Sequence, residues 1–309
     1  MKNILVLTDL SNRAEYAAEY ALNIAIKSKS NLLLCHVLEL STNTTAGLEL
    51  NYPLEDQLGL ESKRIPELKA LTKRLEKLVP EVDATEFTPS INYIIAFGPI
   101  VQFAEKIIEE KLVRLVVIGA HKSNGLSRFI FGSHTHTILD KINCPVLLVP
   151  ENLKFKSLKT IAYASDLTFN NQKVIQYLMD IANPFDALIA VTHISLPGFP
   201  ATASEQAMGY SLNDQLGPDH PTMFYHTIKG NDVKASLMEI TNSGKADILA
   251  LVHKRYGFFD RLFHASISKQ MADDAKVPLL ILPYSFSVDV AEITNDQLDQ
   301  YCFEPGDFR

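Results

Sequence analysis

The sequence predicts an α/β protein made of two similar halves, each with a five-stranded parallel sheet covered by helices. One observation is that short, continuous apolar runs alternate with segments of helical spacing, an order typical of parallel sheets with helices on both faces. A second observation is that this order restarts near residue 157, with individual residues repeating at fixed offsets. A length of 309 residues also suits two such domains.

The elements of the first half follow one another regularly. Residues 3–8 read as a buried strand and 14–26 as a helix, because apolar residues recur at helical spacing there. Asp9 and Ser11 stand between the two, where either side chain could cap the helix. The remaining predicted elements are a strand at 32–38, an irregular excursion at 44–56, a charged amphipathic helix at 60–78, a strand at 87–96, a helix opened by Gly98-Pro99 and running to Glu110, and strands at 112–118 and 145–149.

The second half repeats the first residue by residue. Asp166 repeats Asp9 at an offset of 157, whereas His253 repeats His121 at an offset of 132. Because the offset falls by 25 residues between the second and third strands, most of the helix at 60–78 is missing from the second copy. We predict a first domain at 1–150, a second domain at 157–283, and an acidic C-terminal tail at 284–309 that has no counterpart in the repeat.

Composition limits the class of protein and its partners. The chain has 29 basic and 36 acidic side chains, a net charge of −7, which argues against a nucleic acid or an anionic membrane as partner. The N-terminal apolar run is interrupted by Asp9 and is too short for the apolar region of a signal peptide. No run in the sequence approaches the roughly 18 apolar residues that a membrane span needs. Three widely spaced cysteines predict reduced thiols. We therefore expect a cytoplasmic protein with no nucleic-acid or membrane partner.

The stretch that carries most of the predicted function follows the strand at 112–118. Gly119 ends that strand, a loop containing Lys122 follows, and Gly132-Ser133 precede a helix-like segment. A strand, a glycine-bearing loop and a helix N-terminus together offer backbone N–H groups to a phosphate.

Each half resembles the universal stress protein family, and the whole chain is similar to a tandem member of it. The motifs are the strand ending TDLS at 8–11, the strand LLLCHV at 32–37, and the loop GAHKSNGLSRFIFGS at 119–133 followed by CPVLLVP. The resemblance implies two tandem Rossmann-like (adenine nucleotide alpha hydrolase-like) domains with sheets of strand order 3-2-1-4-5. It also implies that like domains pair through their last strands.

The resemblance implies an ATP or AMP site in the N-terminal domain. Family members that bind ATP carry Gly-x2-Gly-x9-Gly-Ser/Thr after strand four, and here Lys122 replaces the second glycine while the spacing is kept. If the loop needs a positive φ at this position, the Cβ of Lys122 would cost about 1–2 kcal/mol of conformational free energy. Alternatively, its ammonium group could pair with a phosphate. By resemblance, Asp9 would face the ribose and the backbone of Val37 the adenine. The implied nucleotide-binding residues are Thr8, Asp9, Val37, Gly119, Lys122, Gly132, Ser133, His134 and Thr135.

Structural explanations compete with these roles. Gly119 could serve only the strand-to-loop turn, and Ser133 and Asp9 could each serve only as a helix cap. The second half has Leu251 and His264 where the first has Gly119 and Gly132, which predicts a degenerate site and a domain that completes an intramolecular pseudo-dimer.

The sequence holds other candidates for function. His134 and His136 lack a third ligand nearby, so we predict no metal. Histidines that repeat between the halves read as structural. The aromatic residues Phe129, Phe131, Phe258, Phe259 and Phe263 read as a packing seam between the halves.

We therefore expect a stress-response protein that binds ATP or AMP in its N-terminal domain as a regulatory ligand. The sequence shows no nucleophile–base–orienter set, so catalysis would amount at most to slow ATP hydrolysis. The alternative is a protein-interaction module that binds no nucleotide and is built as an intramolecular pseudo-dimer for a protein partner. A homodimer of the whole chain is a further possibility in either case.

Overall fold

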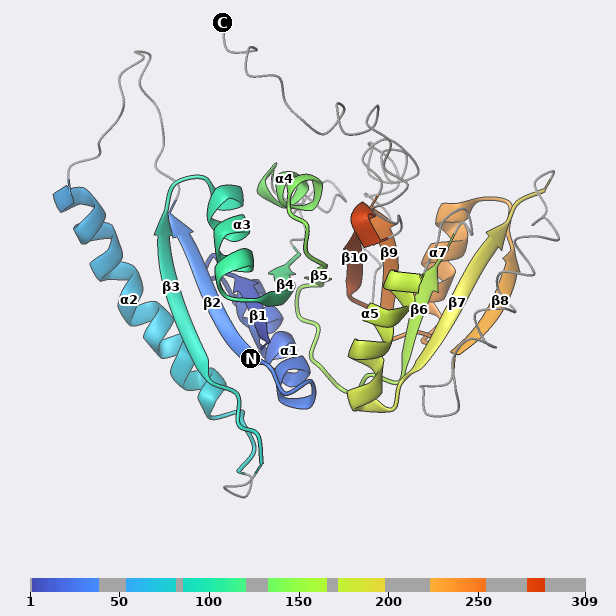
Figure 1. Ribbon diagram of the computed structural model, residues 1–309, viewed down its shortest axis with the longest axis horizontal. Coiled ribbons are helices and arrows are strands. Elements are labelled where there is room, and N and C mark those ends of the chain that lie inside the picture. The colour runs from blue at the N-terminus through green and yellow to red at the C-terminus, as the bar shows by residue number, and fades with distance from the viewer. Residues whose placement is uncertain are drawn as a thin grey trace, which may run out of the picture.

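The computed structural model describes residues 2–38, 54–81, 86–120, 133–165, 172–197, 223–253 and 277–286. Ten strands form one sheet in the order β3-β2-β1-β4-β5-β10-β9-β6-β7-β8 (Figure 1). Read from each outer edge inward, both halves have the order 3-2-1-4-5. The predicted fold class is therefore confirmed, with the two five-stranded sheets joined into one.

The first half contains five strands and four helices among the described residues. Its elements are β1 (Asn3–Leu7), α1 (Asn12–Lys27), β2 (Asn31–Leu38), α2 (Leu54–Glu76), β3 (Ile91–Phe97), α3 (Ile100–Glu110), β4 (Val113–Gly119), α4 (Ser133–Lys141) and β5 (Val146–Val149). Neighbouring strands within this half all run parallel. Their carboxyl ends therefore share one edge of the sheet, where a ligand crevice is expected.

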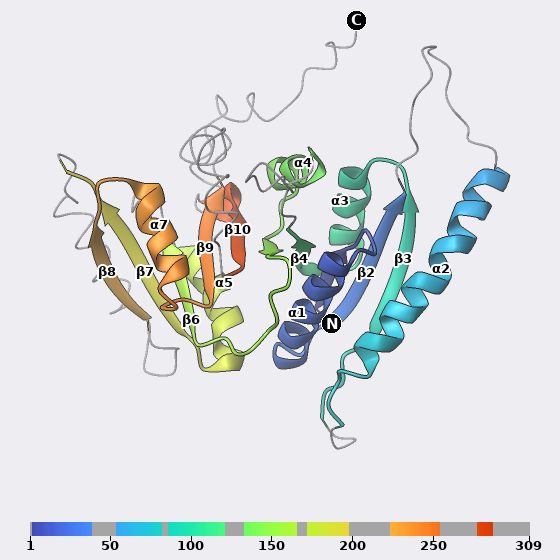
Figure 2. The ribbon, with the colours of Figure 1, turned by 180° about the vertical axis from the view of Figure 1, so that it is seen from behind.

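The second half repeats this arrangement. Its elements are β6 (Thr160–Ala164), α5 (Gln172–Ala182), a short 3-10 helix (Asn183–Phe185), β7 (Leu188–Ser195), β8 (Met223–Lys229), α7 (Val233–Asn242), β9 (Ile248–His253), β10 (Leu279–Pro283) and a last 3-10 turn (Tyr284–Phe286). The strands β2 and β7 both point toward the side of the molecule on which α4 lies (Figures 1 and 2).

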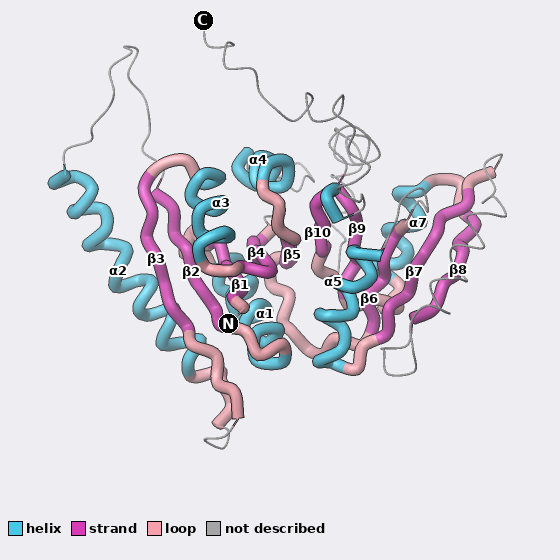
Figure 3. Tube along the Cα trace, viewed as in Figure 1, coloured by secondary structure: helices cyan, strands magenta, loops and turns pink. Residues whose placement is uncertain are grey.

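Helices cover both faces of the sheet (Figure 3). Both halves contribute residues to each of the two apolar cores. Alternate strand residues point to opposite faces, so one core collects apolar side chains of α1, α2 and α5 and the other those of α3, α4 and α7. Because each core is continuous across the middle of the sheet, the two halves share their buried surface.

Helix α2 differs from its prediction at its start. The helix begins at Leu54, so residues 54–56 of the predicted irregular excursion are helical, and it continues through Pro66. Residues 39–53 lie outside the described part of the chain. Leu68, Leu71 and Leu75 of α2 are buried in the core, whereas Leu60 is exposed and Pro66 interrupts the pattern, so the sequence marks the start of this helix weakly.

The register of the repeat also needs a correction. Val116 of β4 pairs with Val146 of β5, and Leu249 of β9 pairs with Leu279 of β10. Strands β9 and β10 therefore both follow their counterparts at an offset of 133, and the offset of 132 assigned to the fourth strand was wrong by one residue. The identical His-Lys pairs at 121–122 and 253–254 had concealed the slip.

The halves meet along β5 and β10, which pair antiparallel with Leu147 opposite Leu280. This confirms the implied pairing through the last strands. The segment between the halves adds a second contact, because the Phe155 ring packs edge-on against Tyr20 at 5.0 Å and lies 5.9 Å from Phe185. The five phenylalanines predicted as the seam lie outside the described residues.

The predicted C-terminal tail begins with a packed turn. Phe286 contacts Tyr177 of α5 edge-on at a centroid distance of 5.5 Å. Residues beyond 286 lie outside the described part of the chain. Among the helices that are described, none combines the length and the apolar character needed to cross a membrane.

Candidate functional site

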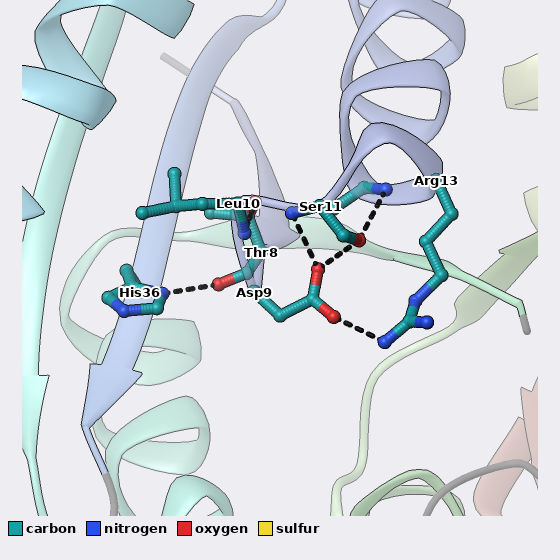
Figure 4. Close-up of polar contacts among 7 residues, drawn as sticks. Thr8, Asp9, Leu10, Ser11, Arg13 and His36 are labelled. Carbon is teal, nitrogen blue, oxygen red and sulfur yellow. Dashed lines mark hydrogen bonds and ion pairs between the residues drawn. The ribbon is translucent and has the colours of Figure 1, made fainter.

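The turn after β1 is the best-defined part of the predicted site (Figure 4). The Thr8 backbone N–H donates to the carbonyl of Cys35 at 2.9 Å, and the Thr8 hydroxyl accepts the N–H of Leu10 at 3.0 Å. Leu10 has a φ of 64°, in the left-handed region that L-residues seldom adopt. These contacts turn the chain sharply from the strand into α1 and leave Asp9 at the carboxyl end of β1.

Asp9 braces this turn with its carboxylate. One oxygen, Oδ1, accepts the N–H of Ser11 at 3.0 Å and also the Ser11 hydroxyl, and the other, Oδ2, pairs with the Arg13 guanidinium. Burial alone would raise the pKa of Asp9, but the hydrogen bonds from Ser11 and the charge of Arg13 hold that pKa below its usual value of 3.8. Asp9 is therefore ionised at neutral pH.

The helix cap is Ser11 and not Asp9. The Ser11 hydroxyl oxygen accepts the N–H of Ala14 at 3.4 Å, as the N-cap of α1. Among the described residues, the contacts of Asp9 leave acceptor capacity on Oδ2, and the side chain is 47% exposed. Asp9 can therefore accept a further hydrogen bond without giving up its role in the turn.

His36 fixes the same turn from the neighbouring strand. Its Nδ1 lies 2.8 Å from the Thr8 carbonyl, and in the second half Nδ1 of His193 lies 3.2 Å from the Ser165 carbonyl. The same brace in both halves confirms that these repeated histidines are set by the fold. Among the described residues, Nε2 of His36 has no hydrogen-bond partner although it is buried.

Val37 lies where β2 extends beyond β1. The pairing of β1 with β2 ends at Leu7 and Cys35, whereas β2 continues to pair with β3 as far as Leu38. The backbone of Val37 therefore lies past the last β1 pair, at the edge of the crevice that the strand order predicts.

Gly119 is required by the packing of α1. A Cβ at this position would lie 2.8 Å from the backbone oxygen of Arg13 and 3.2 Å from the backbone nitrogen of Ala14. The missing side chain thus lets the first turn of α1 contact the end of β4 directly. The turn that bears Asp9 and the strand that leads into the predicted phosphate loop are therefore held together.

The second half is different at this position. With the corrected offset, Val252 occupies the place of Gly119 and His253 that of Ala120, so Leu251 is not the equivalent residue as the sequence comparison had it. A valine side chain prevents the same close approach of a helix backbone. Asp166 and His264 lie outside the described residues, so the degenerate loop itself remains a prediction.

Helix α4 begins where the predicted phosphate loop ends. Ser133 is its first residue, and the backbone N–H groups of His134 and Thr135 belong to its first turn, where they have no partner within the helix. Lys122 and Gly132 lie outside the described part of the chain. The structure therefore brings Thr8, Asp9 and Gly119 together, places Val37 beside them, and leaves the loop itself as a prediction.

Sequence reasoning missed Arg13. It lies in the first turn of α1, whereas Asp9 precedes the N-cap Ser11, so the pair bridges the turn and no helical spacing in the sequence marks it. Within the described residues, no cluster of three or more histidine, cysteine, aspartate or glutamate side chains could hold a metal ion.

A cavity of about 330 Å³ lies away from this site, at the amino ends of β4 and β5. Arg114 on its wall forms an ion pair with Asp180 of α5 at 2.9 Å, and the Tyr177 hydroxyl donates to the Arg114 carbonyl at 2.9 Å. These contacts tie the halves together on the side opposite to the Asp9 turn.

Comparison with known proteins places the sequence in a family. Residues 1–150 match the model of the Universal stress protein family. The chain is 30% identical over 142 residues to the universal stress protein of Aquifex aeolicus, covering 46% of this chain and 100% of that protein. It is 29% identical over 153 residues to a universal stress protein of Methanocaldococcus jannaschii, covering 50% of this chain and 84% of that protein.

A likeness in fold extends over both halves. The crystal structure of a universal stress protein from Archaeoglobus fulgidus superposes on 91% of this chain and 98% of its own, with a TM-score of 0.70. The identity in that superposition is 14%, so it supports the shared architecture and says nothing of the site.

Proposed function

The chain belongs to the universal stress protein family, and from this premise we propose that it is a stress-response protein that binds ATP or AMP in its first half. The observation that carries the proposal is the ionised carboxylate of Asp9, held at the carboxyl end of β1 beside the end of β4. In a sheet of order 3-2-1-4-5, this is the point at which strand order reverses and ligands bind.

The neighbouring groups suit the parts of an adenine nucleotide. The remaining acceptor capacity of Asp9 fits a ribose hydroxyl, and the backbone of Val37 lies where the adenine edge would lie. The first turn of α4, with Ser133, offers backbone N–H groups and the positive end of a helix dipole to phosphates. The retained spacing from Gly119 to Gly132 supports the same assignment.

We assign Asp9 a binding role and not a catalytic one. A carboxylate whose pKa is lowered by Ser11 and Arg13 is a weak general base at neutral pH. The nucleotide is therefore proposed as a regulatory ligand that the site holds, with hydrolysis at most slow.

Calorimetric titration with ATP and with AMP at millimolar concentration tests the proposal. We expect one nucleotide per chain, and Asp9→Asn should weaken binding roughly 10-fold or more, since hydrogen bonds to charged groups contribute about 1.5–3 kcal/mol. The matched control is Asp166→Asn, the same change at the repeated position, which should leave the affinity unchanged. Absence of both heat and thermal stabilisation with either nucleotide would refute the proposal.

The alternative, a protein-interaction module without nucleotide, is favoured by Lys122 in place of the family's glycine and by the degenerate site predicted in the second half. Lys122→Gly separates the two possible effects of the lysine. Tighter ATP binding would show that the side chain obstructs the loop, and weaker binding that its ammonium pairs with a phosphate. ATP that co-purifies with the wild-type protein and is lost in Gly132→Val would exclude the alternative.

A further inference from the structure

Helix α4 belongs by sequence to the first half, and its buried side chains lie in a core to which both halves contribute. Ile138 and Leu139 of this helix, and Ile142 just after it, are buried in the core that α3, α4 and α7 cover. The second-half residues in that core include Leu249, Leu251, Val277, Leu279 and Ile281. Helix α4 therefore shares its apolar core with residues of the second half.

One polar contact from the second half reaches the last turn of α4, and another reaches the segment just after the helix. Nε2 of His253 lies 2.8 Å from Oδ1 of Asp140, and the Ser285 hydroxyl donates to the side-chain oxygen of Asn143. His253 is the last residue of β9 and lies opposite Pro283 of β10, so the sheet fixes its backbone. Its side chain is 13% exposed, against 59% for Asp140.

The contact has a clear electrostatic reason. Asp140 lies in the last turn of α4, where the helix dipole already concentrates negative charge and a carboxylate is unfavourable. An imidazole N–H directed at this carboxylate offsets that cost. His253 thus stabilises the end of α4 at the point where the helix's own charge pattern is least favourable.

The donor residue of this contact differs between the two halves. Ala120 occupies the position in the first half that His253 occupies in the second, and its buried methyl group cannot donate a hydrogen bond. Asp273 repeats Asp140 at an offset of 133, so the acceptor type occurs in both halves but the histidine in one. The described position equivalent to His253 in the first half therefore lacks the donor that the second half supplies.

We infer that His253 is a positioning residue for the nucleotide site of the first half. By holding the end of α4 through Asp140, it sets the direction of a rigid helix about 13 Å long, whose first turn bears Ser133 and the phosphate-facing N–H groups. This rests on the proposed function. A half that has valine in place of Gly119 then serves as a scaffold for the site of its neighbour.

The test measures ATP affinity by calorimetry on full-length variants. His253→Ala and Asp140→Ala should each weaken ATP binding about 3- to 10-fold, in the range of couplings transmitted through a packed element. The double variant should bind no more weakly than either single variant, because both changes remove one contact. His253→Gln keeps an N–H donor and should restore the affinity to within about twofold of the wild type, whereas His253→Leu keeps similar bulk without a donor and should not, contrary to what a purely steric role predicts.

Asp180→Ala is the matched control, since it breaks another contact between the halves at a distance from α4 and should leave ATP affinity unchanged. Hydrogen exchange of the α4 amides without nucleotide is measured on the same proteins, and should be faster in His253→Ala but not in Asp180→Ala.

The outcomes separate this inference from the proposed function. Wild-type affinity in both His253→Ala and Asp140→Ala would overturn the inference and leave the proposed function standing. If the wild-type protein binds no ATP, the proposed function fails. In that case, faster hydrogen exchange of the α4 amides in His253→Ala would still support the inference that His253 stabilises α4. Unchanged exchange would overturn that inference.

Discussion

At the scale of single residues, Asp9 shows how a sequence can locate a site residue without fixing its role. The pattern left Asp9 and Ser11 as equal candidates for the helix cap. The structure assigns the cap to Ser11 and makes Asp9 the brace of the turn. That division depends on the left-handed backbone of Leu10, which a leucine gives no reason to expect.

The buried cysteines give a prediction at this scale. Cys35 and Cys144 are buried, and burial raises the pKa of each thiol to about 12. In a Cys302→Ser background, neither thiol should react with Ellman's reagent at mildly alkaline pH, because the reactive thiolate is scarce and shielded. Both should react once the protein is unfolded in denaturant. Rapid modification of the native protein would contradict the burial of these residues.

At the scale of elements, the strands were predictable because buried parallel strands are continuous apolar runs. The start of α2 was not, since the exposed Leu60 and the helix-interrupting Pro66 weaken the helical pattern that precedes the buried Leu68. The register of β9 was wrong by one residue because the match of His253-Lys254 with His121-Lys122 is a likeness in sequence. Such a likeness does not show which residues of neighbouring strands pair. The register instead comes from the pairing of Leu249 with Leu279.

The contact between α1 and β4 gives a prediction at this scale. Gly119→Ala should lower the free energy of unfolding by about 1–3 kcal/mol, because its Cβ would displace the backbone of Arg13. The matched control is Gly59→Ala in α2, where a Cβ meets nothing within 4 Å. There alanine should raise stability by up to about 1 kcal/mol through helix propensity. Urea denaturation measures both, and equal effects of the two changes would be inconsistent with the packing described.

At the scale of the whole molecule, the repeat predicted two domains and the resemblance predicted how they pair. The structure adds that the pairing is antiparallel and that both apolar cores run through it. Neither fact could be read from the sequence, because periodicity shows which face of a strand is buried but not which strand lies beside it. The domain boundaries at 150 and 157 remain a prediction.

Expression of residues 1–150 alone tests those boundaries. Such a fragment would expose the edge of β5 that β10 covers in the full chain, and an unpaired strand edge recruits another strand. We expect the fragment to fold and to form a homodimer through β5, seen by light scattering coupled to size exclusion. The full chain, whose β5 edge is already paired, is the control. A fragment that stays monomeric at all concentrations would contradict this prediction.

The joining of β5 to β10 within one chain bears on how the two halves can diverge. In a symmetric homodimer, one coding sequence specifies both subunits, so a histidine at one position appears at its symmetry mate as well. Here the equivalent positions of the two halves differ: Ala120 corresponds to His253, and Gly119 corresponds to Val252. The linker also keeps the second half at a high effective concentration, so it stays associated without a ligand of its own. Each half can therefore acquire substitutions that suit a different function, which the identical subunits of a homodimer cannot do.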